Sequence, residues 1–438
     1  MTREVAAFDP TTVALASRRA DDRYFCWEEP DRDGFSLAAI GSAHEIVSRG
    51  VGRVRDLVDD SGEIMRGRLA DEPADLPEGA GALWVGGMSF SAEATGSRTW
   101  SSLPPALLTL PEVILTRSGG RHLITACALV AAGDEPAEVV RRLAGRLGSL
   151  REEPLPPLDP HPGGPAEVAS VAPPLAYEAA VAAAVERIRR GEVEKLVLAR
   201  EVRVTAHAAH SPGALFGAIR EVFGSCFCFC VGTPEAAFVG ASPELLVRRS
   251  GALAATVALA GSARRSADPA VDDHLGEQLL RGSKDRAEHA IVARRIARRL
   301  APLSVWVQQS DEPVVIKVAN IQHLATPIHA QLAEPHSALE LAGLLHPTPA
   351  VGPEPAGVEG ERMIAELEGM DRGWYAGPVG WMDAAEDGEF CVALRSALLR
   401  DRTAHLYAGA GIVADSDPAA ELAETEIKLA ALLPLLAG

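Results

Sequence analysis

Short apolar runs alternate with glycines and charged residues near the C-terminus, a pattern typical of β-strands joined by tight turns. Within residues 371–433 the pattern predicts strands at Trp374–Trp381, Glu389–Leu399 and His405–Val413. An amphipathic helix is predicted after Asp415–Asp417, with Pro418 in its first turn, where the missing N–H is not needed. The glycine-rich run YAGAGIV just before this helix allows the backbone to approach a ligand closely.

The same reasoning predicts elements along the rest of the chain. Before residue 150 we expect a strand at Ala82–Phe90, a hairpin of Glu112–Thr116 with His122–Leu129, and a helix at Pro136–Leu147. Later helices are expected at Tyr177–Arg190, from Ser211-Pro212 onward, and at Lys284–Leu300. Later strands are expected from Lys195 through KLVLAREVRV, and at Ala237–Val239, Glu244–Arg249, Thr256–Leu259, Val305–Val307 and Val314–Leu324. The hairpin-like spacings favour an antiparallel α+β fold over a doubly wound parallel sheet.

Domain organisation is indicated mainly by one proline- and glycine-rich segment, Glu152–Pro173, which we interpret as a linker or surface loop. It separates residues 1–150 from residues 175–435. Because no internal repeat is found, we treat residues 1–438 as a single domain with a less characteristic N-terminal part.

Composition narrows the function classes. The 438 residues are 47% hydrophobic and 23% charged, as in soluble globular proteins, and the net charge is −18. So acidic a chain argues against nucleic acid or an anionic membrane as the main partner. With no signal-like N-terminus, no long apolar run and only six cysteines, we expect a cytoplasmic protein without a disulfide framework. Cys226, Cys228 and Cys230 share one strand face, which we expect to be buried rather than metal-binding.

Several charged residues are candidates for a binding site. Arg395 lies inside an otherwise apolar predicted strand, where a cation needs an anion from the protein or a ligand. Glu421, Glu424 and Lys428 share one face of the last helix, and Asp285 and Glu288 share a face of an earlier helix. Two such carboxylate pairs facing each other would suit Mg²⁺, for which Glu288 and Glu424 are the economical choice. The alternative is that both pairs are solvated helix faces.

Acid–base candidates stand at the ends of apolar runs. Lys195 at the start of a strand could act as a base, and Glu244 beside Ser242-Pro243 as an acid. The alternative is that both are ordinary strand-end charges. His323 could donate to a ligand or satisfy a backbone carbonyl. No Walker loop, GxGxxG after a strand, or GxSxG is present, so nucleotide-binding and serine-hydrolase readings lack support.

Taken together, the runs of residues 175–435 resemble the chorismate-utilising enzymes, and isochorismate synthases most closely. The matching runs are EKLVLAR, ASPELLVRR, LAGSARR, KDRAEH, HLATPI, LLHPTPAV, DRGWYAGPVGW, EFCVALRSALL, YAGAGIV and ELAETEIKL. The resemblance implies two packed antiparallel sheets between layers of helices. It also implies an isomerase that moves the chorismate hydroxyl from C4 to C2, with Mg²⁺ as cofactor.

Residue roles follow from the same resemblance. Lys195 matches the general base that activates water, and Glu244 the general acid that protonates the departing hydroxyl. Glu288 and Glu424 match Mg²⁺ ligands, with Asp285 and Glu421 acting nearby through water. The remaining matches are substrate contacts: Tyr375 and Arg395 at the pyruvyl carboxylate, Gly409 through its backbone N–H, Lys428, and His323 beside the ring carboxylate.

Branches of the family differ in the nucleophile that attacks chorismate and in whether pyruvate is then eliminated from the product. Lys195 favours water over ammonia, so no glutaminase partner is expected, and family members are often monomers. Ala350 resembles isochorismate synthases, whereas salicylate synthases have threonine there. The alternatives are a salicylate synthase and a non-catalytic chorismate-binding homologue. Two departures from the family pattern are Gly352, which is one place early in its loop, and Ser283, which replaces a common glutamate.

Overall fold

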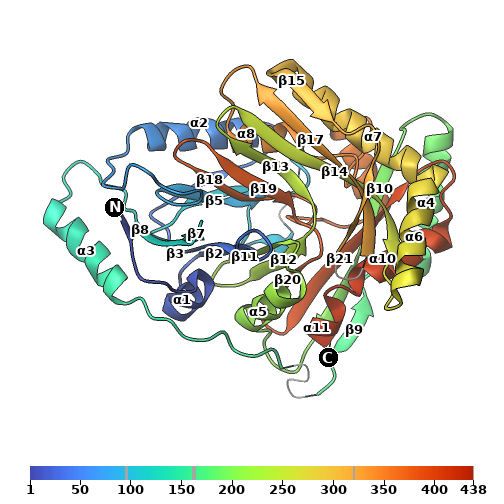
Figure 1. Cartoon of the computed structure of the whole chain (residues 1–438). Coiled ribbons are helices and arrows are strands. Elements are labelled where there is room, and N and C mark those ends of the chain that lie inside the picture. The colour runs from blue at the N-terminus through green and yellow to red at the C-terminus, as the bar shows by residue number, and fades with distance from the viewer. Residues whose placement is uncertain (94–96, 160–163, 319–320, 438) are drawn as a thin grey trace.

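Two large antiparallel β-sheets pack against each other between helices (Figure 1). The structure is a computed structural model that describes residues 1–93, 97–159, 164–318 and 321–437. The 11-stranded sheet has the order β1 (Thr2–Glu4), β8 (Arg121–Ala126), β7 (Val113–Ser118), β3 (Phe35–Ile40), β2 (Tyr24–Glu29), β11 (Phe227–Gly232), β12 (Ala237–Ser242), β20 (Ser396–Arg400), β21 (Thr403–Ile412), β10 (Leu196–Thr205), β9 (Glu167–Ser170).

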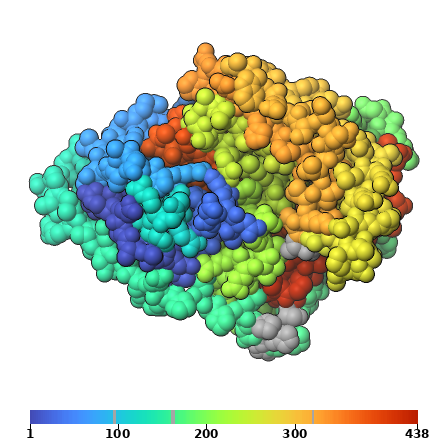
Figure 2. All heavy atoms as spheres, in the orientation of Figure 1, coloured from blue at the N-terminus to red at the C-terminus, as the bar shows by residue number. Residues whose placement is uncertain are grey.

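The 10-stranded sheet has the order β15 (Ser304–Gln309), β17 (Ile321–Leu332), β14 (Leu253–Arg264), β13 (Leu245–Ser250), β19 (Gly388–Val392), β18 (Pro378–Asp383), β5 (Leu83–Met88), β6 (Ala106–Leu110), β4 (His44–Ser48), and β16 (Val314–Lys317) also pairs with β17. Both sheets therefore combine strands from the first 126 residues with strands from the rest of the chain. In the space-filling view the blue N-terminal segments and the yellow and orange segments lie on opposite sides of the visible face (Figure 2).

Helices cover the sheets. They are α1 (Pro10–Ser17), α2 (Arg53–Arg66), α3 (Pro136–Gly148), α4 (Pro174–Arg189), α5 (Pro212–Val222), α6 (Pro269–Arg281), α7 (Ser283–Leu300), α8 (Ala338–Leu345), α9 (Val358–Glu368), α10 (Pro418–Leu429) and α11 (Leu433–Ala437), with short 3₁₀ turns at Arg98–Trp100 and Ala301–Leu303. Helices α7 and α8 pack on strands of the 10-stranded sheet, and α1 and α5 on strands of the 11-stranded sheet (Figure 1). No helix in these described ranges is long and apolar enough to span a membrane.

The main core contains four tryptophans that are fully buried: Trp27, Trp84, Trp374 and Trp381. A second core lies under α1 and α5 and contains Cys226, Cys228 and Cys230. Phe229 and Val231, which alternate with these cysteines, belong to the main core instead. The prediction of a buried cysteine face is therefore confirmed, and it follows from the two-residue period of a strand.

Local signals in the sequence explain several element ends. The Asp417 side chain caps α10 by accepting from the Ala420 N–H, and Pro418 occupies the first turn as predicted. Ser211 caps α5 in the same way. The predicted hairpin of β7 and β8 turns at Gly119 and Gly120, both with positive φ, a conformation that glycine adopts without strain.

Three predicted boundaries are wrong. The expected linker contains strand β9, which pairs with β10. The run Val314–Leu324 forms two strands, β16 and the start of β17, which pair with each other, and its residues 319–320 lie outside the described part of the chain. The strand predicted at Trp374–Trp381 begins only at Pro378, because residues 374–377 form a turn.

The fourth wrong prediction concerns Arg395. The run Glu389–Leu399 is not one strand: β19 belongs to the 10-stranded sheet and β20 to the 11-stranded sheet, so the chain crosses between sheets at residues 393–395. Arg395 lies in this crossing with a φ of 46°. A second crossing lies at Pro243-Glu244, between β12 and β13. Apolar composition hid the crossing at residues 393–395, whereas the segments on either side of Pro243-Glu244 were predicted as separate strands, Ala237–Val239 and Glu244–Arg249.

Candidate active site

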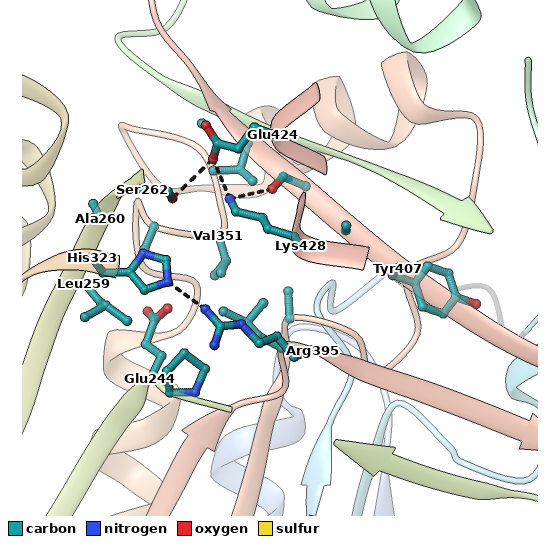
Figure 3. A pocket seen from close by; sticks show the side chains of 18 of the residues that line it. Glu244, Leu259, Ala260, Ser262, His323, Val351, Arg395, Tyr407, Glu424 and Lys428 are labelled. Atoms are coloured by element: carbon teal, nitrogen blue, oxygen red, sulfur yellow. Dashed lines mark hydrogen bonds and ion pairs between the residues drawn. The ribbon is translucent and has the colours of Figure 1, made fainter. Parts of the chain in front are cut away.

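A cavity opens where the two sheets separate, and its empty volume is about 770 Å³ including the space at its open mouth. Of the residues selected from the sequence, the following line it: Glu244, Glu288, His323, Ala350, Tyr375, Arg395, Gly409, Glu424 and Lys428. In Figure 3, Glu244, His323 and Arg395 gather on one side, and Glu424, Lys428 and Ser262 on the opposite side.

The two sheet crossings lie side by side and position Glu244 and Arg395. The Val392 N–H donates to the Glu244 carbonyl at 3.0 Å, and the Ala241 N–H donates to the Arg395 carbonyl at 3.1 Å. The Ser242 hydroxyl donates to the Val392 carbonyl at 2.5 Å. An acid and a cation that are far apart in the sequence therefore enter the cavity from adjacent, tightly bonded backbone segments.

The carboxyl group of Glu244 is held in a protonated state at neutral pH. Burial raises its pKa from 4.5 to about 8, against the opposing effect of nearby Lys195. The Thr348 hydroxyl lies 3.5 Å from Glu244 Oε1 and is a weak donor to it. A buried carboxylic acid that keeps its proton near pH 7 is suited to general acid chemistry.

Arg395 is oriented by His323. The His323 ring contacts the Gly261 carbonyl through Nδ1 at 3.0 Å, and Arg395 Nη2 lies 2.7 Å from His323 Nε2 (Figure 3). Since the carbonyl can only accept, Nδ1 carries the proton and Nε2 accepts from the guanidinium. Burial, together with the charge of Arg395, lowers the pKa of His323 well below its usual value, so the ring is neutral.

The cation of Arg395 is open toward the cavity. Its Nη1 has no hydrogen-bond partner among the described residues, and no ion pair to it is found there. The sequence had indicated that a buried cation at this position needs an anion. A carboxylate of a bound ligand would supply one, since the guanidinium fork can bind it through two hydrogen bonds.

Lys195 is fully buried just before β10 and does not itself line the cavity. Its Nζ forms an ion pair with Glu288 Oε1 at 2.8 Å. The pair lies against Gly411 of β21, where an added Cβ would be 2.2 Å from Glu288 Oε1 and 3.1 Å from Lys195 Cε. Burial opposes the ionisation of Glu288, yet Lys195 prevails and lowers the pKa of that carboxyl group. Glu288 lines the cavity and its carboxylate binds the Lys195 amine, so the amine lies behind Glu288 as seen from the cavity.

Glu424 and Lys428 face the cavity from α10. Lys428 Nζ donates to Glu424 Oε1 at 2.7 Å and to the Gly409 carbonyl at 2.9 Å. Ser262 Oγ lies 3.4 Å from the same Glu424 oxygen. As with Glu288, this carboxylate is paired with a lysine.

The other two predicted carboxylates lie outside the cavity lining. Glu421 is buried and pairs with Lys284 at 2.7 Å, which joins α10 to α7. Asp285 lies in the first turn of α7 next to Gly261. Across the described residues, no three His, Cys, Asp or Glu side chains converge as a metal site. Glu288 and Glu424 still place two carboxylates, which are hard oxygen donors, at one cavity. Mg²⁺ is usually bound by one or two protein carboxylates.

Aromatic and loop residues complete the wall. The ring of Tyr375 stacks on that of Tyr407 with centroids 5.2 Å apart. Ala350 lies in a turn in which the Gly352 N–H donates to the Thr348 carbonyl at 2.9 Å. A Cβ on Gly352 would lie 2.8 Å from Pro347, so the early glycine allows this loop to close tightly on itself.

Sequence reasoning did not select several other residues of the cavity lining, among them the polar residues Ser262, Arg372 and Tyr407 and the glycine Gly411. These four lie in runs that were recognised, namely LAGSARR, DRGWYAGPVGW and YAGAGIV with the tyrosine that opens it. Arg372 carried the clearest signal, because it is a charged residue directly before an apolar aromatic run.

Comparisons with known proteins identify the family. The family model described as "Chorismate binding enzyme" matches residues 1–437. The chain is 34% identical to the salicylate biosynthesis isochorismate synthase of Pseudomonas aeruginosa, over 99% of this chain and 89% of that protein. It is 31% identical to the isochorismate synthase MenF of Bacillus subtilis, over 100% of this chain and 93% of that protein. The solved structure of MenF, the menaquinone-specific isochorismate synthase from Escherichia coli, has a TM-score of 0.82 and 26% identity, covering 100% of this chain and 94% of that one. The chain therefore belongs to the family of chorismate-binding enzymes, with isochorismate synthases among its relatives.

Proposed function

We propose that this protein is an isochorismate synthase, a Mg²⁺-dependent isomerase that converts chorismate reversibly to isochorismate. The observation that supports this most directly is that one cavity of a family member holds a protonated acid, Glu244, and a cation, Arg395, whose Nη1 has no partner among the described residues. A dicarboxylate substrate needs such a cation, and loss of a ring hydroxyl needs such an acid.

The proposed reaction uses one base and one acid. After its ammonium group has given up a proton, the neutral amine of Lys195 takes a proton from water as the water oxygen forms its bond to C2. The ring double bonds shift and the C4–O bond breaks, while Glu244 gives its proton to the departing hydroxyl, which leaves as water. One water enters and one leaves, so substrate and product are isomers.

Arg395 and Lys428 are proposed to hold substrate carboxylates, and Tyr375, Gly409, His323 and Ala350 to complete the substrate-binding wall. The neutral, carbonyl-bonded ring of His323 suits it to holding Arg395 in place rather than to donating to the ligand.

Glu288 and Glu424 are the proposed Mg²⁺ ligands, with Asp285 and Glu421 acting through water. When bound, the ion offsets the repulsion between a substrate carboxylate and the acidic residues of the site. Glu288 and Glu424 form ion pairs with Lys195 and Lys428 in this structure, so both carboxylates would have to leave these lysines to hold the ion.

We expect the purified protein to convert chorismate to isochorismate only when Mg²⁺ is present. Chromatography of the products, with EDTA and then with excess Mg²⁺, measures both the reaction and its metal dependence. Salicylate and pyruvate as the main products would place the protein among salicylate synthases, contrary to the expectation from Ala350. Binding of chorismate without consumption in either condition would indicate a non-catalytic homologue, and unchanged turnover in EDTA would reject the metal.

Arg395→Ala is expected to weaken chorismate binding by about 30-fold or more, because truncating one partner of a buried charge pair costs at least about 2 kcal/mol. Isothermal titration with chorismate measures the change in Kd. Arg400→Ala is a matched control, since Arg400 ends β20, the strand that directly follows Arg395, and bonds to Thr99 outside the cavity. Equal Kd values for wild type and Arg395→Ala would reject the anchoring role.

A further inference from the structure

Arg372 joins three separate segments at one wall of the cavity. Its Nη1 donates to the Val351 carbonyl at 2.9 Å, and its Nη2 to the Val197 carbonyl at 2.8 Å. Its Nε donates to Glu368 Oε2 at 3.0 Å, and its Nη2 also donates to Glu368 Oε1. Arg372 is 4% exposed and lines the cavity, but these bonds are all made to protein atoms.

The guanidinium is fixed in orientation from both sides. Glu368, at the end of α9, has a side chain only 1% exposed, and its Oε1 also accepts from the Ala199 N–H at 2.6 Å. The Phe90 ring lies under the guanidinium at 4.2 Å. A planar fork held by a carboxylate and an aromatic face has little freedom, so the two carbonyl bonds are made in a defined geometry.

These bonds connect the loop that contains Ala350 to the strand that follows Lys195. Val351 is the next residue after Ala350, and Val197 lies two residues after Lys195. The same loop is attached to the same strand a second time, because Glu354 and Lys195 form an isolated antiparallel bridge. Loop and strand are therefore joined at Lys195 itself and again two residues after it.

We propose that Arg372 is a positioning residue for the reaction, which keeps the Ala350–Val351 wall at a fixed distance from Lys195. This inference rests on the function proposed above. Because substrate carboxylates are held by Arg395 and Lys428 on other segments, loss of the Arg372 bonds lowers kcat while leaving KM nearly unchanged.

Arg372→Lys is the first test. A lysine keeps the positive charge beside Glu368, but its single nitrogen cannot reach both carbonyls in the geometry of the fork. We expect kcat to fall at least about 10-fold with KM changed less than about threefold. Arg362→Lys is the control, because Arg362 is on α9, the helix that ends at Glu368, and pairs with Glu93 at the surface. Wild-type kcat in Arg372→Lys would overturn the proposal, as would a loss carried entirely by KM.

Amide hydrogen exchange provides a readout that does not depend on turnover. In Arg372→Lys the amides of Val351, Gly352 and Ala199 should exchange at least about 10-fold faster, while those of the distant hairpin β7–β8 keep the wild-type rate. Unchanged exchange at all three amides would overturn the proposal. If the wild type does not consume chorismate, the proposed function fails, and the exchange rates still decide whether Arg372 holds the loop.

A second variant covers the case in which Arg372→Lys does not fold. Glu368→Gln keeps the size of the side chain, but its amide nitrogen faces an N–H of the guanidinium, so one of the two bonds that fix the fork is lost. We expect a several-fold lower kcat at unchanged KM, with faster exchange at Val351 and Gly352. Wild-type values of both kcat and exchange in this variant would overturn the proposal.

Discussion

Glu244→Gln is expected to lower the turnover of chorismate by about 100-fold or more, because a general acid contributes at least that factor. Glutamine has nearly the same size and can still accept from Thr348, but it has no acidic proton to give to the departing hydroxyl. Steady-state kinetics at pH 7 measures the loss. Circular dichroism of the same samples should show an intact fold.

The pH dependence of the wild type gives the same prediction a second test. Burial raises the pKa of Glu244 to about 8, so the acid is protonated below that pH and loses its proton above it. The value of kcat/KM should therefore fall as the pH rises through about 8, and in Glu244→Gln this decline should be absent. A decline that persists in the variant would assign it to another group. Glu201→Gln serves as control, since Glu201 is also buried but pairs with His405 outside the cavity.

Lys195→Ala is expected to reduce turnover by about 100-fold or more, through loss of the base that activates water. Lys195→Arg separates this role from the ion pair, because arginine keeps a cation beside Glu288 but does not give up its proton at neutral pH. Both variants should therefore be inactive, while thermal unfolding should be less affected in Lys195→Arg than in Lys195→Ala.

Kinetics and melting curves of both Lys195 variants distinguish the outcomes. Lys317→Ala is the control, because Lys317 pairs with Asp272 and Asp273 away from the cavity. An active Lys195→Arg enzyme would show that the positive charge matters and proton transfer does not.

The properties of Glu244 and Arg395 in the cavity depend on where the chain crosses between the sheets. Glu244 and Arg395 are both residues at which the chain leaves one sheet and enters the other, so their side chains point between the sheets rather than into a ladder. Burial raises the pKa of the acid, and Nη1 of the cation has no hydrogen-bond partner in the described part of the chain. The two sheet crossings that interrupt the strands therefore also supply the charged side chains of the cavity.

The sequence by itself determined the local structure and the kinds of side chains available. The caps at Ser211 and Asp417, the turn at Gly119-Gly120 and the buried cysteine face of β11 were all predicted correctly, because each depends on residues close together in the chain. The antiparallel α+β class followed from hairpin spacings, and the candidate acids, bases and cations were found by their placement at the ends of apolar runs and by the family resemblance.

Only the tertiary structure decided which of these residues meet. A run of buried residues looks the same whether it continues in one sheet or crosses to another, so the crossing at Arg395 was predicted as plain strand. The position of Lys195 behind Glu288, the support of Arg395 by His323, and the bonds from Arg372 to Val197 and Val351 all join residues more than 20 positions apart. Local periodicity reports the burial of a residue, whereas its partners depend on how distant segments pack, and that information is distributed over the whole chain.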